Sequence, residues 1–165
     1  MLVVSNTSPI TNLAAIGQLE LLRLLYQTII IPEEVYTELV LKGGSNNPGA
    51  TEVQAGVWIE TRKVTNRALV QQLLTSTLHS GEVAAIVLAH ELNADLLLID
   101  EEEGRYLATR VGVPRLGLLG VLLDAKAAGL IPLVRPVLDA LRAGPDFWVN
   151  KRVYVDTLRR AGEWP

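Results

Sequence analysis

Short apolar segments rich in Leu, Ile and Val alternate along this chain with segments whose apolar residues repeat at helical spacing. The apolar segments are short enough to be buried strands, and turn residues bound them. We predict strands at residues 2–4, 28–32, 94–100 and 113–117. Because strands separated by helices pair in parallel through crossover connections, the alternation predicts an α/β fold with a mainly parallel sheet.

The segments between these strands predict helices. Their expected ranges are 8–25, 33–42, 66–76, 79–93, 104–112, 118–129, 132–144 and 147–163. A break near Gly17 interrupts the first, and Ser80 is the expected N-cap of the fourth. Residues 57–64 fit a strand or a helix end equally well, and residues 43–51 form the clearest loop.

The composition is that of a globular protein. A chain of 165 residues with 49% hydrophobic residues is long enough for one buried core, so we expect a single domain over residues 1–165. The absence of cysteine excludes disulfides and Cys-bound zinc. Any metal ion must therefore bind to oxygen atoms or to the two histidines.

No segment looks like a targeting or membrane-spanning element. The N-terminus has no basic region before its apolar residues, and Asn6 interrupts them too early for a signal peptide. The longest apolar runs are too short to cross a bilayer. We expect a soluble, cytoplasmic protein that does not bind a membrane.

Charge is distributed unevenly along the chain. Residues 1–104 contain 5 Lys and Arg against 13 Asp and Glu, whereas residues 105–165 contain 10 against 5. One interpretation is the ordinary surface charge of helices. The other is an acidic site beside a basic surface, which would suit a metal ion acting on a polyanion.

Oxygen-bearing side chains occur where predicted strands end and where helices approach the same edge of the sheet. They are Asn6, Glu38, Glu82 and Asp100. Each acid has an ordinary explanation. Glu82 and Asp100 could favour the dipole at the start of a helix, and Glu38 could lie with Glu34 on a solvated helix face. Together, however, they would repel one another unless a hard cation such as Mg²⁺ or Mn²⁺ bound between them. Such an ion can activate water against a phosphodiester.

Four stretches, in this order and spacing, resemble the PIN-domain family, specifically its small prokaryotic branch of VapC-like toxins. They are "VVSNTSPITNLAAIGQLELL", "IIIPEEVYTEL", "LHSGEVAAIVLAHELNADLLLIDEEEGRYLA" and "GLLGVLLDAKAAGLI". The resemblance implies a three-layer α/β/α sandwich and Mg²⁺- or Mn²⁺-dependent ribonuclease activity. It also implies a small antitoxin protein that blocks the site, and a homodimer.

Carried over one residue at a time, the resemblance places Glu38, Glu82 and Asp100 on the family's acidic ligand positions, and we predict these three to be catalytic. Glu101 or Glu103 corresponds to a further, more variable position. The metal ligands expected in this way are Asn6, Glu38, Glu82, Asp100 and Glu103. Thr7 or Ser8 matches the hydroxyl that follows the first acid and helps to hold the site.

The chain departs from the family pattern at Asn6, where an aspartate is expected. An amide oxygen can bind a hard cation but contributes a dipole instead of a full charge. Three interpretations remain open. Asn6 is a ligand in a weaker nuclease, or it marks a module that binds RNA or an antitoxin without cutting, or it is an engineered change that silences toxicity.

Several other polar and aromatic residues have two interpretations. His79 and His90 are expected on the surface or in helix packing instead of at a metal. Arg105 could contact a phosphate or lie on a helix surface. The basic tail could contact RNA but is expected to be a solvated helix face; it consists of Lys151, Arg152, Arg159 and Arg160. The three tryptophans could stack on bases, although core packing is commoner; they are Trp58, Trp148 and Trp164.

Overall fold

The computed structural model describes residues 1–75 and 77–165. Its strands are β1 (Val3–Ser5), β2 (Ile29–Pro32), β3 (Ile59–Arg62), β4 (Leu96–Leu98) and β5 (Arg115–Leu116). The first helices are α1 (Thr7–Ala15), α2 (Glu20–Tyr26), α3 (Glu33–Tyr36), the π-helix η1 (Thr37–Lys42), α4 (Ala50–Ala55) and α5 (Arg67–Leu73). The remaining helices are α6 (Ser80–Glu91), α7 (Glu102–Arg110), α8 (Leu118–Ala127), α9 (Arg135–Ala143) and α10 (Lys151–Arg160).

Within the described residues the strands form one five-stranded parallel sheet in the order β3-β2-β1-β4-β5. Val4 of β1 is in register with Ile30 on one side and with Leu97 on the other. The chain thus builds outward from β1 to β2 and β3, and then crosses to β4 on the opposite side of β1. In parallel α/β sheets this reversal creates a crevice beyond the carboxyl ends of the two central strands.

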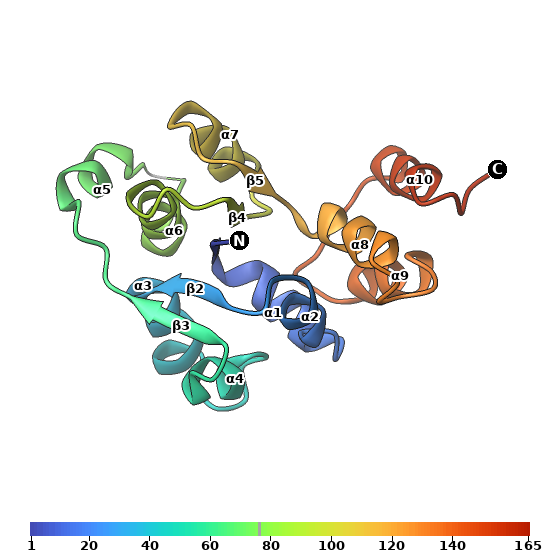
Figure 1. The fold of residues 1–165 in the computed structure, drawn as a ribbon, viewed down its shortest axis with the longest axis horizontal. Coiled ribbons are helices and arrows are strands. Elements are labelled where there is room, and N and C mark those ends of the chain that lie inside the picture. The colour runs from blue at the N-terminus through green and yellow to red at the C-terminus, as the bar shows by residue number, and fades with distance from the viewer. Residues whose placement is uncertain (76) are drawn as a thin grey trace.

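Helices cover both faces of the sheet, which confirms the expected three-layer fold. Val3 and Leu98 point toward the layer that contains α1, α2, α8 and α9. Val4 and Leu97 point the other way, against α6 and its neighbours α5 and α7. This alternation is the two-residue period of a strand, and both faces are apolar because both are covered. Figure 1 shows α5, α6 and α7 grouped together, while α8, α9 and α10 gather where the chain ends.

The elements follow the predicted pattern with local differences. The undecided residues 57–64 contain β3, which pairs with β2. The predicted helix 66–76 ends at Leu73, and its last residue, Ser76, lies outside the described residues. The loop predicted at 43–51 is shorter because α4 begins at Ala50. Helix α7 begins at Glu102, two residues before the predicted start, so the acidic run supplies its first turn.

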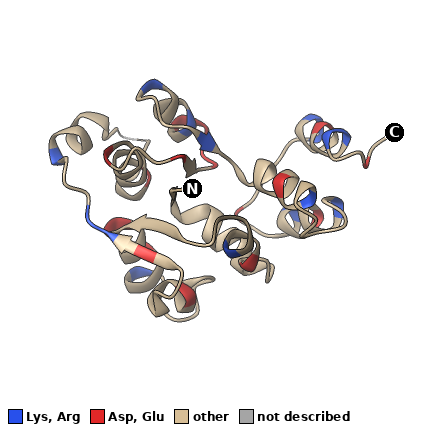
Figure 2. Cartoon of the chain, viewed as in Figure 1, with Lys and Arg blue, Asp and Glu red and all other residues tan. Residues whose placement is uncertain are grey.

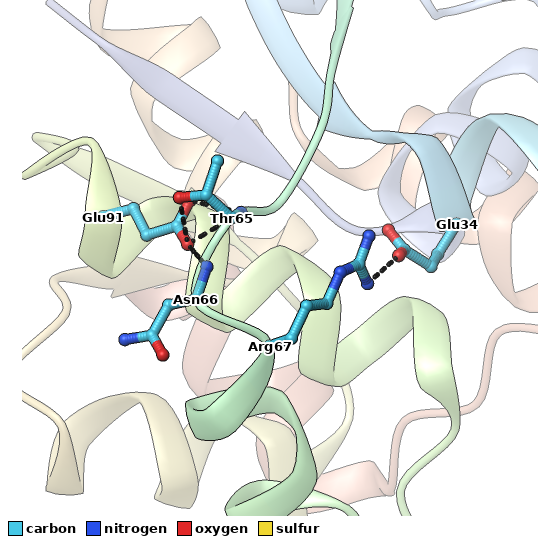
Figure 3. Close-up of polar contacts among 5 residues, drawn as sticks. All are labelled: Glu34, Thr65, Asn66, Arg67 and Glu91. Atoms are coloured by element: carbon cyan, nitrogen blue, oxygen red, sulfur yellow. Dashed lines mark hydrogen bonds and ion pairs between the residues drawn. The ribbon is translucent and has the colours of Figure 1, made fainter.

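The connection between β3 and α5 is tied to two other helices (Figure 3). The Glu91 carboxylate, at the end of α6, accepts hydrogen bonds from the backbone N–H and hydroxyl of Thr65 at 2.9 and 3.0 Å, and from the N–H of Asn66. Arg67 forms an ion pair with Glu34 of α3, at 2.8 Å. These contacts hold the connection and the start of α5 against the end of α6 and against α3.

No helix in the described part of the chain is long and apolar enough to cross a membrane.

Candidate active site

The candidate site lies at the carboxyl ends of β1 and β4, where the direction of sheet building reverses. Asn6 directly follows β1, and its backbone N–H bonds to the carbonyl of Leu98 at 2.9 Å, which extends the pairing of the two strands. Asp100 and Glu101 follow β4 on the adjacent strand. This is the crevice in which α/β sheets bind their ligands.

A cavity of about 280 Å³ opens at this crevice, and every side chain that lines it is polar. It is lined by Asn6, Thr7, Ser8, Thr11, Asn12, Glu38, His79, Glu82, Glu101 and Asp146. Four of these residues are acids, and none is a lysine or an arginine. A lining of this kind suits a cation, water and the oxygen atoms of a phosphate, and it does not suit an apolar ligand.

Asn6 is the most buried member of the lining, with 1% of its surface exposed. Its Nδ2 donates a hydrogen bond to Glu101 Oε2 at 3.1 Å. Its Oδ1 is buried and has no hydrogen-bond partner among the residues that the structure describes. Since an unpaired buried acceptor costs about 1–3 kcal/mol, this oxygen is a ready ligand for a donor or a cation.

Glu38 is brought to the cavity by η1, a π-helical turn of a kind that is frequent at functional sites. Thr7 Oγ1 donates to Glu38 Oε2 at 2.9 Å. A Cβ atom on Gly81 would lie 2.8 Å from the same oxygen, so glycine lets the carboxylate approach the start of α6. Glu34, one helical turn earlier, pairs with Arg67 instead, and the two glutamates serve different parts of the structure.

Glu82 lies in the first turn of α6, and its Oε2 accepts a hydrogen bond from the backbone N–H of His79 at 2.7 Å. His79, not Ser80, is therefore the N-cap, one residue before the predicted position. Burial raises the pKa of Glu82 against this hydrogen bond, and the negative charges of Glu101 and Glu38 raise it further. Glu82 thus caps the helix and also faces the other two acids.

Glu101 also points into the cavity. Its carboxylate accepts from Asn6 Nδ2 and, at 2.7 Å, from Ser8 Oγ. The preceding residue, Asp100, lies on the other side, because successive side chains of extended backbone point in opposite directions. One Asp100 oxygen accepts from the N–H of Leu118, at the start of α8, at 2.7 Å. Its other oxygen is buried without a partner in the described part of the chain.

Asp100 therefore lines an adjoining groove of about 690 Å³ instead of the acidic cavity. Burial raises the pKa of Asp100 to about 6, and the charge of Glu101 acts in the same direction, whereas the Leu118 hydrogen bond opposes it. The structure thus brings Glu38 and Glu82 together around the acidic cavity and places Asp100 in the adjoining groove. The groove and the cavity share Ser8, Asn12, Glu101 and Asp146.

Comparison with known proteins agrees with this architecture. The family model DUF3368, a PIN domain, matches residues 2–163. The chain belongs to the PIN-domain family. Proteins of this family are usually nucleases and generally use divalent metal ions. No curated protein is similar enough in sequence to count as a match.

The PIN fold is also found in a solved structure that resembles this one. A PilT N-terminus domain protein from the hyperthermophilic archaeon Sulfolobus solfataricus P2 superposes with a TM-score of 0.52. The two share 16% sequence identity, and the match covers 91% of this chain and 98% of the archaeal chain. At this identity the similarity establishes a common fold.

The donor atoms of this PIN domain fit the divalent ion that its family generally uses. The acids around the cavity offer only oxygen ligands, and the unpaired Oδ1 of Asn6 adds a neutral one, the donor set that hard cations prefer. Over residues 1–75 and 77–165, however, no three acidic or histidine side chains are close enough to hold an ion as they stand. Glu38 and Glu101 each accept hydrogen bonds from protein hydroxyl or amide groups.

The structure separates the two candidates for the variable acidic position of the family. Glu103 is exposed on α7, where it accepts hydrogen bonds from the hydroxyls of Thr75 and Thr77. It does not line the cavity, whereas Glu101 does. Helix α7 begins at Glu102, so the helical turn directs Glu103, the second residue of α7, away from Asn6. We replace Glu103 with Glu101 in the set of candidate ligands.

Two titratable residues of the cavity, His79 and Asp146, were not expected at the site. His79 is exposed, as expected, and it also lines the cavity, while His90 lies exposed near the end of α6. Asp146 reaches the cavity from the loop between α9 and α10. No strand end or helical spacing marks Asp146 in the sequence. The only local signal is the Gly144-Pro145 pair before it, which predicts a turn.

The remaining sequence candidates lie around the groove or in the core. Trp148 is 83% exposed and lines the groove, whereas Trp58 and Trp164 pack against the core. The basic residues of α10 are exposed, and Arg160 also lines the groove. Arg105 lines both the groove and a further cavity beside it.

Proposed function

We propose that this PIN domain is a metal-dependent endoribonuclease that hydrolyses RNA phosphodiesters. Its candidate ligands for Mg²⁺ or Mn²⁺ are Asn6, Glu38, Glu82 and Glu101, with Asp100 in the adjoining groove. The observation that carries this proposal is the cavity lined by polar residues, four of them acids, at the reversal point of the sheet. The usual nuclease activity of the family supports the same reaction class.

The residues around the cavity have distinct roles in this proposal. A bound divalent ion would lower the pKa of a water molecule and neutralise charge on the phosphodiester. Thr7 orients Glu38, while Asn6 and Ser8 orient Glu101. Glu82, in the first turn of α6, would hold the ion together with Glu38.

We further propose that the protein is the toxin of a toxin–antitoxin pair, with a small antitoxin protein as partner and a homodimer as its working form. The resemblance of four stretches of the sequence to VapC-like toxins supports this assignment. Induced expression should then arrest growth, and the Glu82→Gln variant should relieve the arrest. Equal arrest by both forms would contradict the link between toxicity and the cavity.

A second candidate function is an RNA- or antitoxin-binding module without cleavage. The hydrogen bond from Asn6 Nδ2 to Glu101 favours it, because the amide holds one of the acids without a cation. An aspartate at this position would instead oppose Glu101 with a second negative charge. An ion would then be needed to bring the two together.

RNA cleavage in Mg²⁺, Mn²⁺ or EDTA tests the proposed activity. The wild type should cleave only with a divalent ion, and Glu82→Gln should lower the rate by about a hundredfold or more. Glu52→Gln, which removes an exposed acid of α4, is the matched control and should leave the rate unchanged. Full activity of Glu82→Gln would refute the proposal. Cleavage by Asn6→Asp but not by the wild type would establish the non-catalytic module.

A further inference from the structure

A second, basic cavity lies at the far end of the groove. It has a volume of about 280 Å³ and is lined by Glu102, Arg105, Tyr106, Thr109 and Arg115. The four residues from α7 are spaced three, four and seven apart, so they share one face of that helix. Arg115 comes from β5, the edge strand beside α7. Figure 2 shows basic residues along α7 and at β5.

The basic cavity connects to the acidic one. The groove of about 690 Å³ shares Glu102 and Arg105 with the basic cavity. It shares Ser8 and Glu101, among others, with the acidic cavity. The groove therefore adjoins both cavities. A chain molecule that lies in the acidic cavity can follow the groove toward α7.

The two arginines of the basic cavity suit a phosphate group. Arg115 Nε donates to the Arg105 carbonyl and to Thr109 Oγ1, both at 2.9 Å, and these bonds fix the direction of its guanidinium. Arg105 forms no ion pair with any residue that the structure describes. The lining of the cavity contains two arginines and one acid, Glu102, so its net charge is positive. The charge of Arg105 also acts on Asp100 in the neighbouring groove, where it lowers the pKa of that carboxyl against the effect of burial. Arginine binds phosphate oxygens with two parallel N–H groups.

Tyr106 gives the same cavity an aromatic surface. The side chain is 64% exposed, so its ring contributes little to the packing of the core. Arg110, one turn later on α7, holds its guanidinium carbon 5.9 Å from the ring centroid. An exposed aromatic ring beside arginines is the arrangement on which proteins stack unpaired bases of single-stranded nucleic acids.

We propose that this basic cavity is a subsite for single-stranded RNA next to the cleavage site. One unpaired base stacks on Tyr106, and a neighbouring phosphate binds between Arg105 and Arg115. This inference rests on the proposed ribonuclease function and specifies which part of the surface holds the substrate. It predicts that the enzyme requires unpaired nucleotides on one side of the bond that is cut.

Binding can be measured separately from cleavage, with a fluorescent single-stranded RNA of about 12 nucleotides in EDTA, by fluorescence anisotropy. Tyr106→Ala should weaken binding about tenfold, and Tyr106→Trp should retain wild-type affinity, because stacking is worth this much per base. Arg105→Gln should weaken binding and lower the slope of log K against log salt by about 0.7. Arg62→Ala, which removes a basic residue from β3 at the opposite edge of the sheet, should change neither.

Wild-type affinity of both Tyr106→Ala and Arg105→Gln would overturn the subsite. Equal binding of a duplex of the same sequence would do so as well, because paired bases cannot stack on Tyr106. The outcome is independent of the proposed activity. Tyr106-dependent binding without any metal-dependent cleavage would support the subsite and refute the nuclease. In the cleavage assay, the subsite requires a raised KM for Tyr106→Ala, and an unchanged KM contradicts it.

Discussion

Asn6 both organises the acidic cavity and lowers its charge. Its Nδ2 donates a hydrogen bond to Glu101. Its Oδ1 accepts no hydrogen bond from any residue that the structure describes, so it can bind another ligand. An amide at this position leaves the metal-free cavity with one negative charge fewer than an aspartate would. The metal-free fold gains stability from this, and the affinity for a divalent ion falls, since an amide oxygen attracts a cation less than a carboxylate does.

At Asp100, too, a group that would suit a metal ion lowers the stability of the metal-free fold. Burial raises its pKa from 3.8 to about 6, so the folded protein binds this proton more tightly than the unfolded chain does. The stability that the protonated form contributes is therefore complete below about pH 4 and is lost as the pH rises through about 6. Above that pH the folded state carries a buried carboxylate that is only partly satisfied by Leu118.

Replacement of Asp100 by Asn should consequently stabilise the metal-free protein at pH 7. The amide carbonyl retains an acceptor for the Leu118 N–H and removes the buried charge, which is worth about 1–3 kcal/mol. Urea unfolding in EDTA at pH 7 and pH 4 provides the measurement. The gain should be present at pH 7 and absent at pH 4. A loss of stability at pH 7 would show that the buried carboxylate of Asp100 does not destabilise the metal-free fold.

At the scale of elements, the site depends on the contact between η1 and the start of α6. Gly81 has no side chain, and this allows the Glu38 carboxylate to approach the first turn of α6. The twelve-residue α6 presents the positive end of its dipole there, which favours the negative charges of Glu38 and Glu82. A side chain at position 81 would therefore change where the Glu38 carboxylate lies.

Gly81→Ala should preserve the fold and weaken metal binding. Alanine is the better helix former, but its Cβ would lie 2.8 Å from Glu38 Oε2 and displace that carboxylate. Displaced ligands typically cost 10- to 100-fold in metal affinity, so we expect a loss of about tenfold. Circular dichroism and Mn²⁺ titration measure the two effects. Unchanged Mn²⁺ affinity would mean that Glu38 does not bind the ion from this position.

The sequence patterns predicted the buried elements well and the site only in part. Strands β1, β2 and β4 were predictable because they are apolar on both faces. Strand β3 was ambiguous because only Ile59 of its four residues is buried. Its sequence therefore shows neither the two-residue repeat of a strand nor the 3.6-residue repeat of a helix. The choice between Glu101 and Glu103 depends on where the strand ends and α7 begins. That boundary is set by tertiary packing, which no local pattern records.

At the scale of the whole molecule, the uneven charge along the sequence becomes a spatial arrangement. Three acids of the first part, Glu38, Glu82 and Glu101, line the cavity, while α7 and α10 carry basic residues around the groove (Figure 2). The parallel sheet brings this about, since residues separated by up to 95 positions, such as Asn6 and Glu101, meet at one edge. The interpretation as an acidic site beside a basic surface is therefore favoured over random surface charge.

Calorimetric titration with Mn²⁺ tests most directly whether the acidic cavity binds a divalent ion. The wild type should bind weakly, Asn6→Asp more tightly, and Glu82→Gln and Glu101→Gln should lose measurable binding. Glu103→Gln, which changes an acid on α7 outside the cavity, should bind like the wild type. If Mn²⁺ binding were the same in the wild type and in Glu82→Gln and Glu101→Gln, the ion would not bind in this cavity and the proposed chemistry would be wrong.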